Sequence, residues 1–163
     1  MSTKKKIRIR RAKPQDRNLV LKLWGEYLAD EGSAAVGGMV PPTEHNMKVF
    51  GSIFDAYVSG EHDGVVLLHA EDAVLIWGDP GGQLFETPLG RSAQGWGVYV
   101  RKEQRGKGIS AALRTKGANI LKSMGFESIC GQVDLNNDSA WESVDSFGFK
   151  VGGTIVYYDL KEH

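Results

Sequence analysis

Apolar positions along the chain follow two kinds of spacing, one typical of helices and one typical of strands. After Pro14, apolar side chains recur at helical spacing, and Gly32 is placed to end that helix. A second helix is predicted from Thr43, where an apolar stripe begins. We also predict helices over residues 106–124 and 138–147. The long pattern over 106–124 is followed at once by a glycine, which commonly ends helices.

Strand-like segments lie between and around these helices. Residues 7–11 alternate apolar and basic side chains, as a half-buried strand does. Two glycine- and proline-containing stretches, 32–42 and 79–94, are predicted to be loops. The predicted strands are 7–11, 65–69, 74–77, 95–100, 128–135 and 155–160.

The predicted order of elements is β-α-α-β-β-β-α-β-α-β, which indicates an α/β (α+β) chain with a mixed sheet and helices on both faces. The length of 163 residues, with 41% hydrophobic and 25% charged side chains, is typical of one globular domain. We therefore expect a single domain over residues 1–163, in which 1–6 form a flexible basic arm.

Several classes of protein are disfavoured by composition. No apolar run is long enough to span a bilayer, and the start lacks the apolar stretch of a secretory signal, so we expect a cytoplasmic protein without membrane contact. The single cysteine, Cys130, excludes an internal disulfide and is predicted to be a small apolar filler. The histidines His45, His62, His69 and His163 have no ligand spacing, so no metal is predicted.

Charge is balanced in total but unevenly distributed. The 20 basic and 20 acidic residues give a net charge of zero, which argues against a nucleic-acid-binding protein. Basic residues gather in 1–13 and 101–122, whereas 26–86 carries eleven acids and one base. These groups are either solvated faces, or an anion site late in the chain beside an acidic region that attracts cations.

The loop that precedes the third helix, Arg105-Gly106-Lys107-Gly108-Ile109-Ser110, carries the strongest chemical signal. Glycines let the backbone approach a ligand closely, and a helix start favours an anion such as phosphate. No Walker phosphate loop is present. A dinucleotide-binding turn is a poor second reading, because residues 101–105 separate the glycines from the preceding strand.

The segment from Val100 to Ser110, followed by Ala111-Ala112-Leu113, resembles the signature of the GNAT superfamily of acetyl-CoA-dependent N-acyltransferases. Serine stands at position 110 where the family usually has glycine or alanine. Asn137-x-x-Ala140 and Gly148-Phe149 are similar to a second block of the family, and the opening strand and first helix resemble its beginning.

The resemblance implies a single-domain GNAT fold whose mostly antiparallel sheet opens between strands 98–100 and 129–135. The backbone of the first strand would hold the pantetheine arm of acetyl-CoA, the loop amides would hold its pyrophosphate, and Asn137 would reach the arm from the other wall. The cofactor-binding residues implied are Val98, Tyr99, Val100, Arg105, Gly106, Lys107, Gly108, Ile109, Ser110 and Asn137.

The activity implied is transfer of an acetyl group from acetyl-CoA to a primary amine, by direct attack in a ternary complex. Where many relatives carry a tyrosine that protonates the leaving thiolate, this chain has Val144. The thiolate then leaves unprotonated, or Tyr157 or Tyr158 replaces the missing acid. Asp134 and Glu86 are the candidate bases.

Two further interpretations stay open at this stage. Val144 also fits a non-catalytic acyl-CoA-binding module of the same fold, and a nucleotide-binding protein is a weaker alternative. The acids between residues 26 and 86 predict a cationic acceptor, such as a polyamine, an aminoglycoside-like compound or a lysine-bearing peptide. A homodimer is compatible with the sequence.

Overall fold

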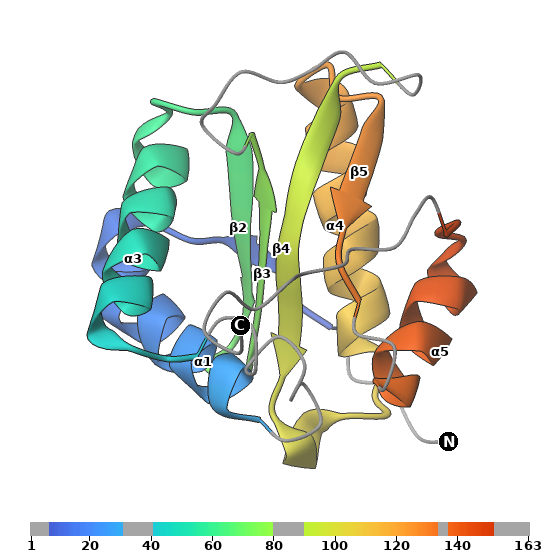
Figure 1. The fold of residues 1–163 in the computed structure, drawn as a ribbon, viewed down its shortest axis with the longest axis horizontal. Coiled ribbons are helices and arrows are strands. Elements are labelled where there is room, and N and C mark those ends of the chain that lie inside the picture. The colour runs from blue at the N-terminus through green and yellow to red at the C-terminus, as the bar shows by residue number, and fades with distance from the viewer. Residues whose placement is uncertain (1–6, 31–40, 80–89, 134–136, 152–163) are drawn as a thin grey trace, which may run out of the picture.

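The computed structural model describes residues 7–30, 41–79, 90–133 and 137–151. Within them, five strands form one sheet in the order β1-β2-β3-β4-β5 (Figure 1). The strands are β1 (Arg10–Arg11), β2 (Gly64–His69), β3 (Ala73–Gly78), β4 (Ser92–Val100) and β5 (Ser128–Gly131). Neighbouring strands are antiparallel, except that β4 and β5 are parallel. The predicted mixed, mostly antiparallel sheet is therefore confirmed.

Helices cover both faces of this sheet (Figure 1). They are α1 (Arg17–Ala29), α3 (Glu44–Ser59), α4 (Ile109–Ser123) and α5 (Asp138–Phe147), with short 3-10 turns η1 (Pro14–Asp16) and η3 (Lys102–Gln104). Val66 and Leu68 of β2 belong to the core under α1 and α3, whereas Val65 and Leu67 face the core under α4. Because side chains alternate along a strand, a strand covered on both faces is apolar almost throughout, as β2 is.

The helix predictions agree with the structure because the local signals are strong. The Thr43 hydroxyl accepts a hydrogen bond from the backbone N–H of Asn46 at 3.2 Å and caps α3. Gly60 ends α3 with φ of 79°, a left-handed conformation that glycine adopts easily. α1 ends at Ala29, before the predicted stop at Gly32, which lies outside the described residues. None of the described helices is both long and apolar enough to cross a membrane.

The strand boundaries differ from the prediction in three places. β4 begins at Ser92, inside the predicted loop 79–94, because parallel pairing with β5 extends it. β1 and β5 are shorter than predicted, and the predicted last strand, 155–160, lies outside the described residues, as do residues 1–6. Cys130 is exposed, so the prediction of a buried filler is wrong: it lies on the exposed half of β5, with its Sγ 3.0 Å from the Ser92 hydroxyl.

Candidate functional site

The sheet opens between its two parallel strands. Pairing of β4 with β5 ends at Gly95 and Gly131, whereas β4 continues to Val100 beside β3. On the β3 side, Gly95 and Gly97 pair with consecutive residues, so Trp96 is the extra residue of a β-bulge. A bulge bends its strand and increases its twist. The two strands therefore separate where the bulge occurs, and in Figure 1 β5 stops well short of the far end of β4.

Among the described residues, the separated part of β4 has no strand partner on the β5 side. The N–H of Arg101 donates to the Asp72 carbonyl beyond β3 at 2.9 Å. Because backbone groups alternate in direction along a strand, those of Val98 and Val100 point away from β3, toward the opening. The Val100 carbonyl there accepts a hydrogen bond from Arg105 Nε at 2.9 Å. As far as the described residues go, the Val98 N–H and carbonyl and the Val100 N–H have no partner and could pair with an extended ligand.

The loop between η3 and α4 presents a group of free amides. Gly106 and Gly108 have φ of 75° and 79°, a left-handed conformation that turns the chain sharply into α4. Gly108 is the N-cap residue and supplies no side-chain cap. Within the described part of the chain, the N–H groups of residues 106–110 have no hydrogen-bond acceptor, whereas the Arg105 N–H donates to the Lys102 carbonyl at 3.2 Å. Amides at a helix start bind anions, so the arrangement fits a phosphate.

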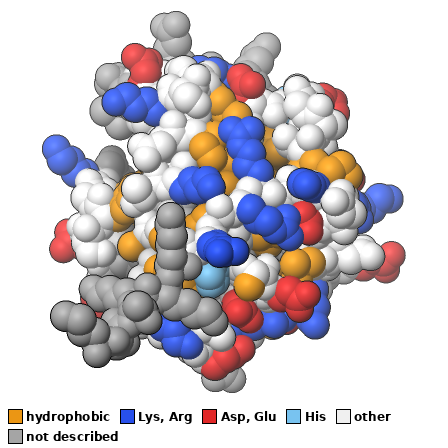
Figure 2. Space-filling model, turned by 180° about the vertical axis from the view of Figure 1, so that it is seen from behind, with side chains coloured by type: hydrophobic (Ala, Val, Ile, Leu, Met, Phe, Trp, Pro, Cys, Tyr) orange, Lys and Arg blue, Asp and Glu red, His pale blue; other side chains and the backbone are white. Residues whose placement is uncertain are grey.

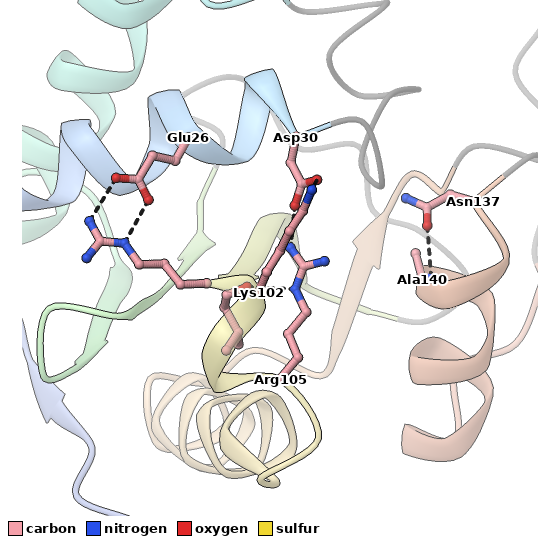
Figure 3. Close-up of polar contacts among 8 residues, drawn as sticks. Glu26, Asp30, Lys102, Arg105, Asn137 and Ala140 are labelled. Carbon is pink, nitrogen blue, oxygen red and sulfur yellow. Dashed lines mark hydrogen bonds and ion pairs between the residues drawn. The ribbon is translucent and has the colours of Figure 1, made fainter.

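The basic side chains around this loop are occupied by partners from the protein itself (Figure 3). Arg105 hydrogen-bonds to Asp30 at the end of α1, and Lys102 Nζ lies 3.7 Å from the other oxygen of that carboxylate. The Asp30 side chain is only 3% exposed. Lys107 Nζ donates to the Gln104 side-chain oxygen at 2.7 Å and to the Glu103 carbonyl at 3.1 Å. The loop therefore offers backbone amides rather than unpaired side-chain charges to a ligand.

A second ion pair fixes the same helix to the strand end. Arg101 forms a bidentate pair with Glu26 of α1, in which both N···O distances are 2.8 Å, and Arg101 also lies 3.9 Å from Asp72. The hydrogen bonds from Arg101 lower the pKa of the Glu26 carboxyl. They also raise the pKa of the Arg101 guanidinium, so both groups stay charged. The C-terminal half of α1 is thereby held against residues 101–105.

These pairs change the interpretation of the uneven charge. Acids of the 26–86 region are paired with bases from outside it: Glu26 and Asp72 with Arg101, Asp30 with Lys102 and Arg105, Asp55 with Arg17, and Asp63 with Arg91. Other cations lie on the surface, and Figure 2 shows Lys and Arg side chains across the middle of one face. Much of the predicted acidic region is therefore neutralised within the fold.

α5 lies beside α4, on the same side of β4 as β5 (Figure 1). The Asn137 side-chain oxygen accepts a hydrogen bond from the Ala140 N–H at 3.0 Å and caps this helix (Figure 3). The amide nitrogen of Asn137 stays available as a donor toward a ligand. Val144 lies about two turns after Asn137 along α5, and its side chain has no proton to give.

The remaining predicted site residues divide into two groups. The Tyr99 side chain is 7% exposed and packs under α1, 6.0 Å from the Tyr27 ring, so it faces the core. Asp134, Glu86, Tyr157 and Tyr158 lie outside the described residues, and their roles as base or acid stay predictions. In the described ranges, no cluster of three or more His, Cys, Asp or Glu side chains has metal-site geometry.

Several aromatic side chains pack near the bulge, and the sequence favours core positions over substrate contacts for Trp24, Tyr27 and Trp77. Trp24 and Trp77 are 1% and 2% exposed and are core residues. Burial raises the pKa of Tyr57 to about 12, and its hydroxyl both donates to the Asp79 carbonyl at 2.6 Å and accepts from Trp96 at 2.9 Å. Tyr27 is only partly buried: its ring packs against the core, as predicted, and lies over Gly97 of β4. The position of Tyr27 over β4 depends on the bulge at Trp96, which no sequence pattern predicts.

Comparisons with known proteins agree with the fold described above. The family model described as "Acetyltransferase (GNAT) family" matches residues 48–149. Similar solved structures include the aminoglycoside 6'-N-acetyltransferase AAC(6')-IG from Acinetobacter haemolyticus, at 16% identity and a TM-score of 0.69, covering 94% of this chain and 97% of that one. The yncA protein from Salmonella typhimurium, solved with its cofactor acetyl-CoA, has 15% identity and a TM-score of 0.72, covering 91% and 82%.

A third similar structure is AAC(6')-Iy bound to a bisubstrate analogue of coenzyme A and acetylneamine, at 10% identity and a TM-score of 0.71, covering 95% of this chain and 98% of that one. At these identities the structural likeness concerns the fold. No curated protein matches the sequence.

Proposed function

The chain belongs to the acetyltransferase (GNAT) family, and we propose that it transfers an acetyl group from acetyl-CoA to a primary amine. The observation that carries the proposal is the set of free amides at 106–110, which lies at the start of α4 beside the open edge of β4. One end of this arrangement suits a diphosphate and the other suits an extended amide chain. Acetyl-CoA carries both groups.

The residues of the site fit such a cofactor in three places. The amides of Gly106 to Ser110 would hold the pyrophosphate. The backbone of Val98 and the N–H of Val100 would pair with the pantetheine amides, as a neighbouring strand does. The Asn137 amide nitrogen would donate from the start of α5.

The reaction needs little covalent participation from the protein. The amine nitrogen attacks the thioester carbonyl, the new C–N bond forms, and the C–S bond breaks with its electron pair going to sulfur. The amine proton passes to a base or to water, and Asp134 and Glu86 are the candidate bases. Holding both substrates in line supplies a large part of the rate acceleration. Val144 gives no proton to the sulfur, so the thiolate leaves as an anion or takes its proton from Tyr157 or Tyr158.

For the acceptor, we propose a cationic amine. Both AAC(6')-IG and AAC(6')-Iy are named as acetyltransferases of aminoglycosides, which carry several amino groups. Glu44, Glu61 and Glu71 are exposed acids of the 26–86 region for which, in the described structure, no base lies at ion-pair distance. Negative potential raises the encounter rate with a cation, and salt screens it.

The test is a screen of primary amines with acetyl-CoA, in which free thiol and acetylated product are both measured. We expect thiol release that depends on an amine, with a higher kcat/KM for a polyamine than for glutamate and a polyamine rate that falls as salt rises. Binding of acetyl-CoA without turnover of any amine would instead favour the non-catalytic module, for which Val144 argues. A preference for glutamate would contradict the cationic acceptor alone.

A further inference from the structure

Arg114 is a partly buried cation on α4 that has no acidic partner among the described residues. It lies one turn after Ser110, and its Nε donates to the Ser110 hydroxyl at 3.3 Å. In the described residues, no carboxylate oxygen lies within ion-pair distance of its guanidinium, whereas Arg10, Arg17, Arg91, Arg101 and Arg105 all have one. Burial lowers the pKa of Arg114, which reflects a charge that has lost water without gaining a counterion. A ligand anion would compensate this loss.

Tyr27 lies on the other side of the sheet, against the backbone of β4. A Cβ atom at Gly97 would be 2.9 Å from Tyr27 Cε1 and 3.0 Å from its hydroxyl oxygen, so only glycine leaves room for the ring. Gly97 directly follows the bulge residue Trp96 and precedes Val98, whose backbone belongs to the proposed cofactor site. The Tyr27 hydroxyl forms no hydrogen bond with any described residue.

The two side chains act on each other although their helices cover opposite faces of the sheet. Burial raises the pKa of the Tyr27 hydroxyl, and the positive charge of Arg114 acts in the opposite direction. β5 has left β4 at this level, so a long side chain on α4 can approach the Tyr27 hydroxyl past the open edge. A hydroxyl and a guanidinium, neither of them paired with an acid in the described part of the chain, therefore flank the opening from its two sides.

We propose that Arg114 and the Tyr27 hydroxyl stabilise the negative charge on the coenzyme A sulfur as the thiolate leaves. This inference rests on the proposed function. It assigns to Arg114 and Tyr27 the stabilisation of the leaving thiolate, for which Val144 has no suitable group. When the C–S bond breaks, its electron pair goes to sulfur, the Tyr27 O–H donates a hydrogen bond to it, and Arg114 supplies the countercharge. No proton transfer is required, because a thiol of pKa near 8.5 is a tolerable anion.

The main test uses Arg114→Gln and Tyr27→Phe, which keep the approximate size of each side chain. Removing a group that stabilises charge only in the transition state lowers kcat by about 100-fold in well-formed sites, so we expect a loss of roughly 10- to 100-fold with KM for acetyl-CoA within about twofold. Arg114→Lys should keep much of the rate, because it keeps the charge. Lys122→Gln removes the same charge from the far end of the same helix, and its rate should equal that of the wild type.

A binding measurement separates this role from a structural one. Calorimetric titration at mildly alkaline pH compares coenzyme A with desulfo-coenzyme A, which differ only at the sulfur. We expect the wild type to bind coenzyme A about tenfold more tightly, and Arg114→Gln to bind both alike. The inference is overturned if either substitution leaves kcat and this affinity ratio unchanged. If the wild type binds neither compound, the proposed function fails first and this inference fails with it.

Discussion

Replacement of Asp30 by asparagine tests how the fold shapes the loop 105–110, the proposed phosphate site. Asp30 is 3% exposed and accepts a hydrogen bond from Arg105, while Lys102 lies 3.7 Å from its second oxygen. The asparagine side chain would keep the shape but turn an N–H donor or a neutral oxygen toward two cations. Breaking a fully buried ion pair costs about 3–5 kcal/mol. Here the Arg105 and Lys102 side chains are 41% and 71% exposed and would regain water, so we expect Asp30→Asn to lower the free energy of unfolding by about 2 kcal/mol.

The expected loss is measurable as heat stability and as cofactor affinity. For a chain of this length, about 2 kcal/mol corresponds to a fall in Tm of roughly 4–8 °C by calorimetry. Because Arg105 begins the loop whose amides form the proposed phosphate site, the Kd for coenzyme A should rise severalfold, while kcat at saturating acetyl-CoA changes less. Asp55→Asn is the matched control, since its pair with Arg17 is 55% and 42% exposed and should contribute less than about 1 kcal/mol.

The reasoning is refuted if Asp30→Asn and Asp55→Asn have the same Tm, or if Asp30→Asn lowers Tm without weakening coenzyme A binding. The first result would show that the buried carboxylate does not hold the loop. The second would show that the loop conformation does not set the affinity.

Three further predictions concern other parts of the chain. Gly108→Asp places a side chain at φ of 79° and an anion beside the free amides, so calorimetry should show that the affinity for coenzyme A falls at least tenfold. Lys107→Ala should change this affinity less than threefold, because the Lys107 side chain is bound within its own loop. Equal effects of the two substitutions would contradict the amide site. Hydrogen bonds from Arg10 lower the pKa of Asp16 to about 2, below its unfolded value near 3.8. This carboxylate therefore stabilises the fold above about pH 4 and loses its contribution as the pH falls toward about 2. The free energy of unfolding should fall less steeply over this pH range in Asp16→Asn than in the wild type. Identical curves would contradict the pairing. Val144→Tyr should leave kcat within about threefold if the thiolate leaves unprotonated, whereas a large gain would show that the native enzyme lacks an acid.

The sequence predicted the elements whose signals are local. The helices α1, α3, α4 and α5 follow from apolar spacing, a threonine cap and terminal glycines, and β2 and β3 follow from continuous apolar runs. The turn at Gly106 and Gly108 could also be predicted, because few residues other than glycine adopt a left-handed conformation at a helix start.

Features that depend on distant parts of the chain were not readable. The start of β4 at Ser92 depends on parallel pairing with Ser128, and the bulge at Trp96 depends on the register with β3. The ion pair of Asp30 with Arg105 joins residues 75 positions apart, so the sequence shows two charged regions but not their neutralisation. Tyr27 packs against the core as its sequence position predicts, but only the fold shows that its hydroxyl lies against Gly97.

The most direct test of the central claim is nuclear magnetic resonance of the backbone amides during a titration with coenzyme A. The account predicts that the largest shifts occur at the N–H groups of Gly106 to Ser110 and at Val98 and Val100, and that they are absent in Gly108→Asp. Binding that shifts other amides while residues 106–110 stay unchanged would contradict it.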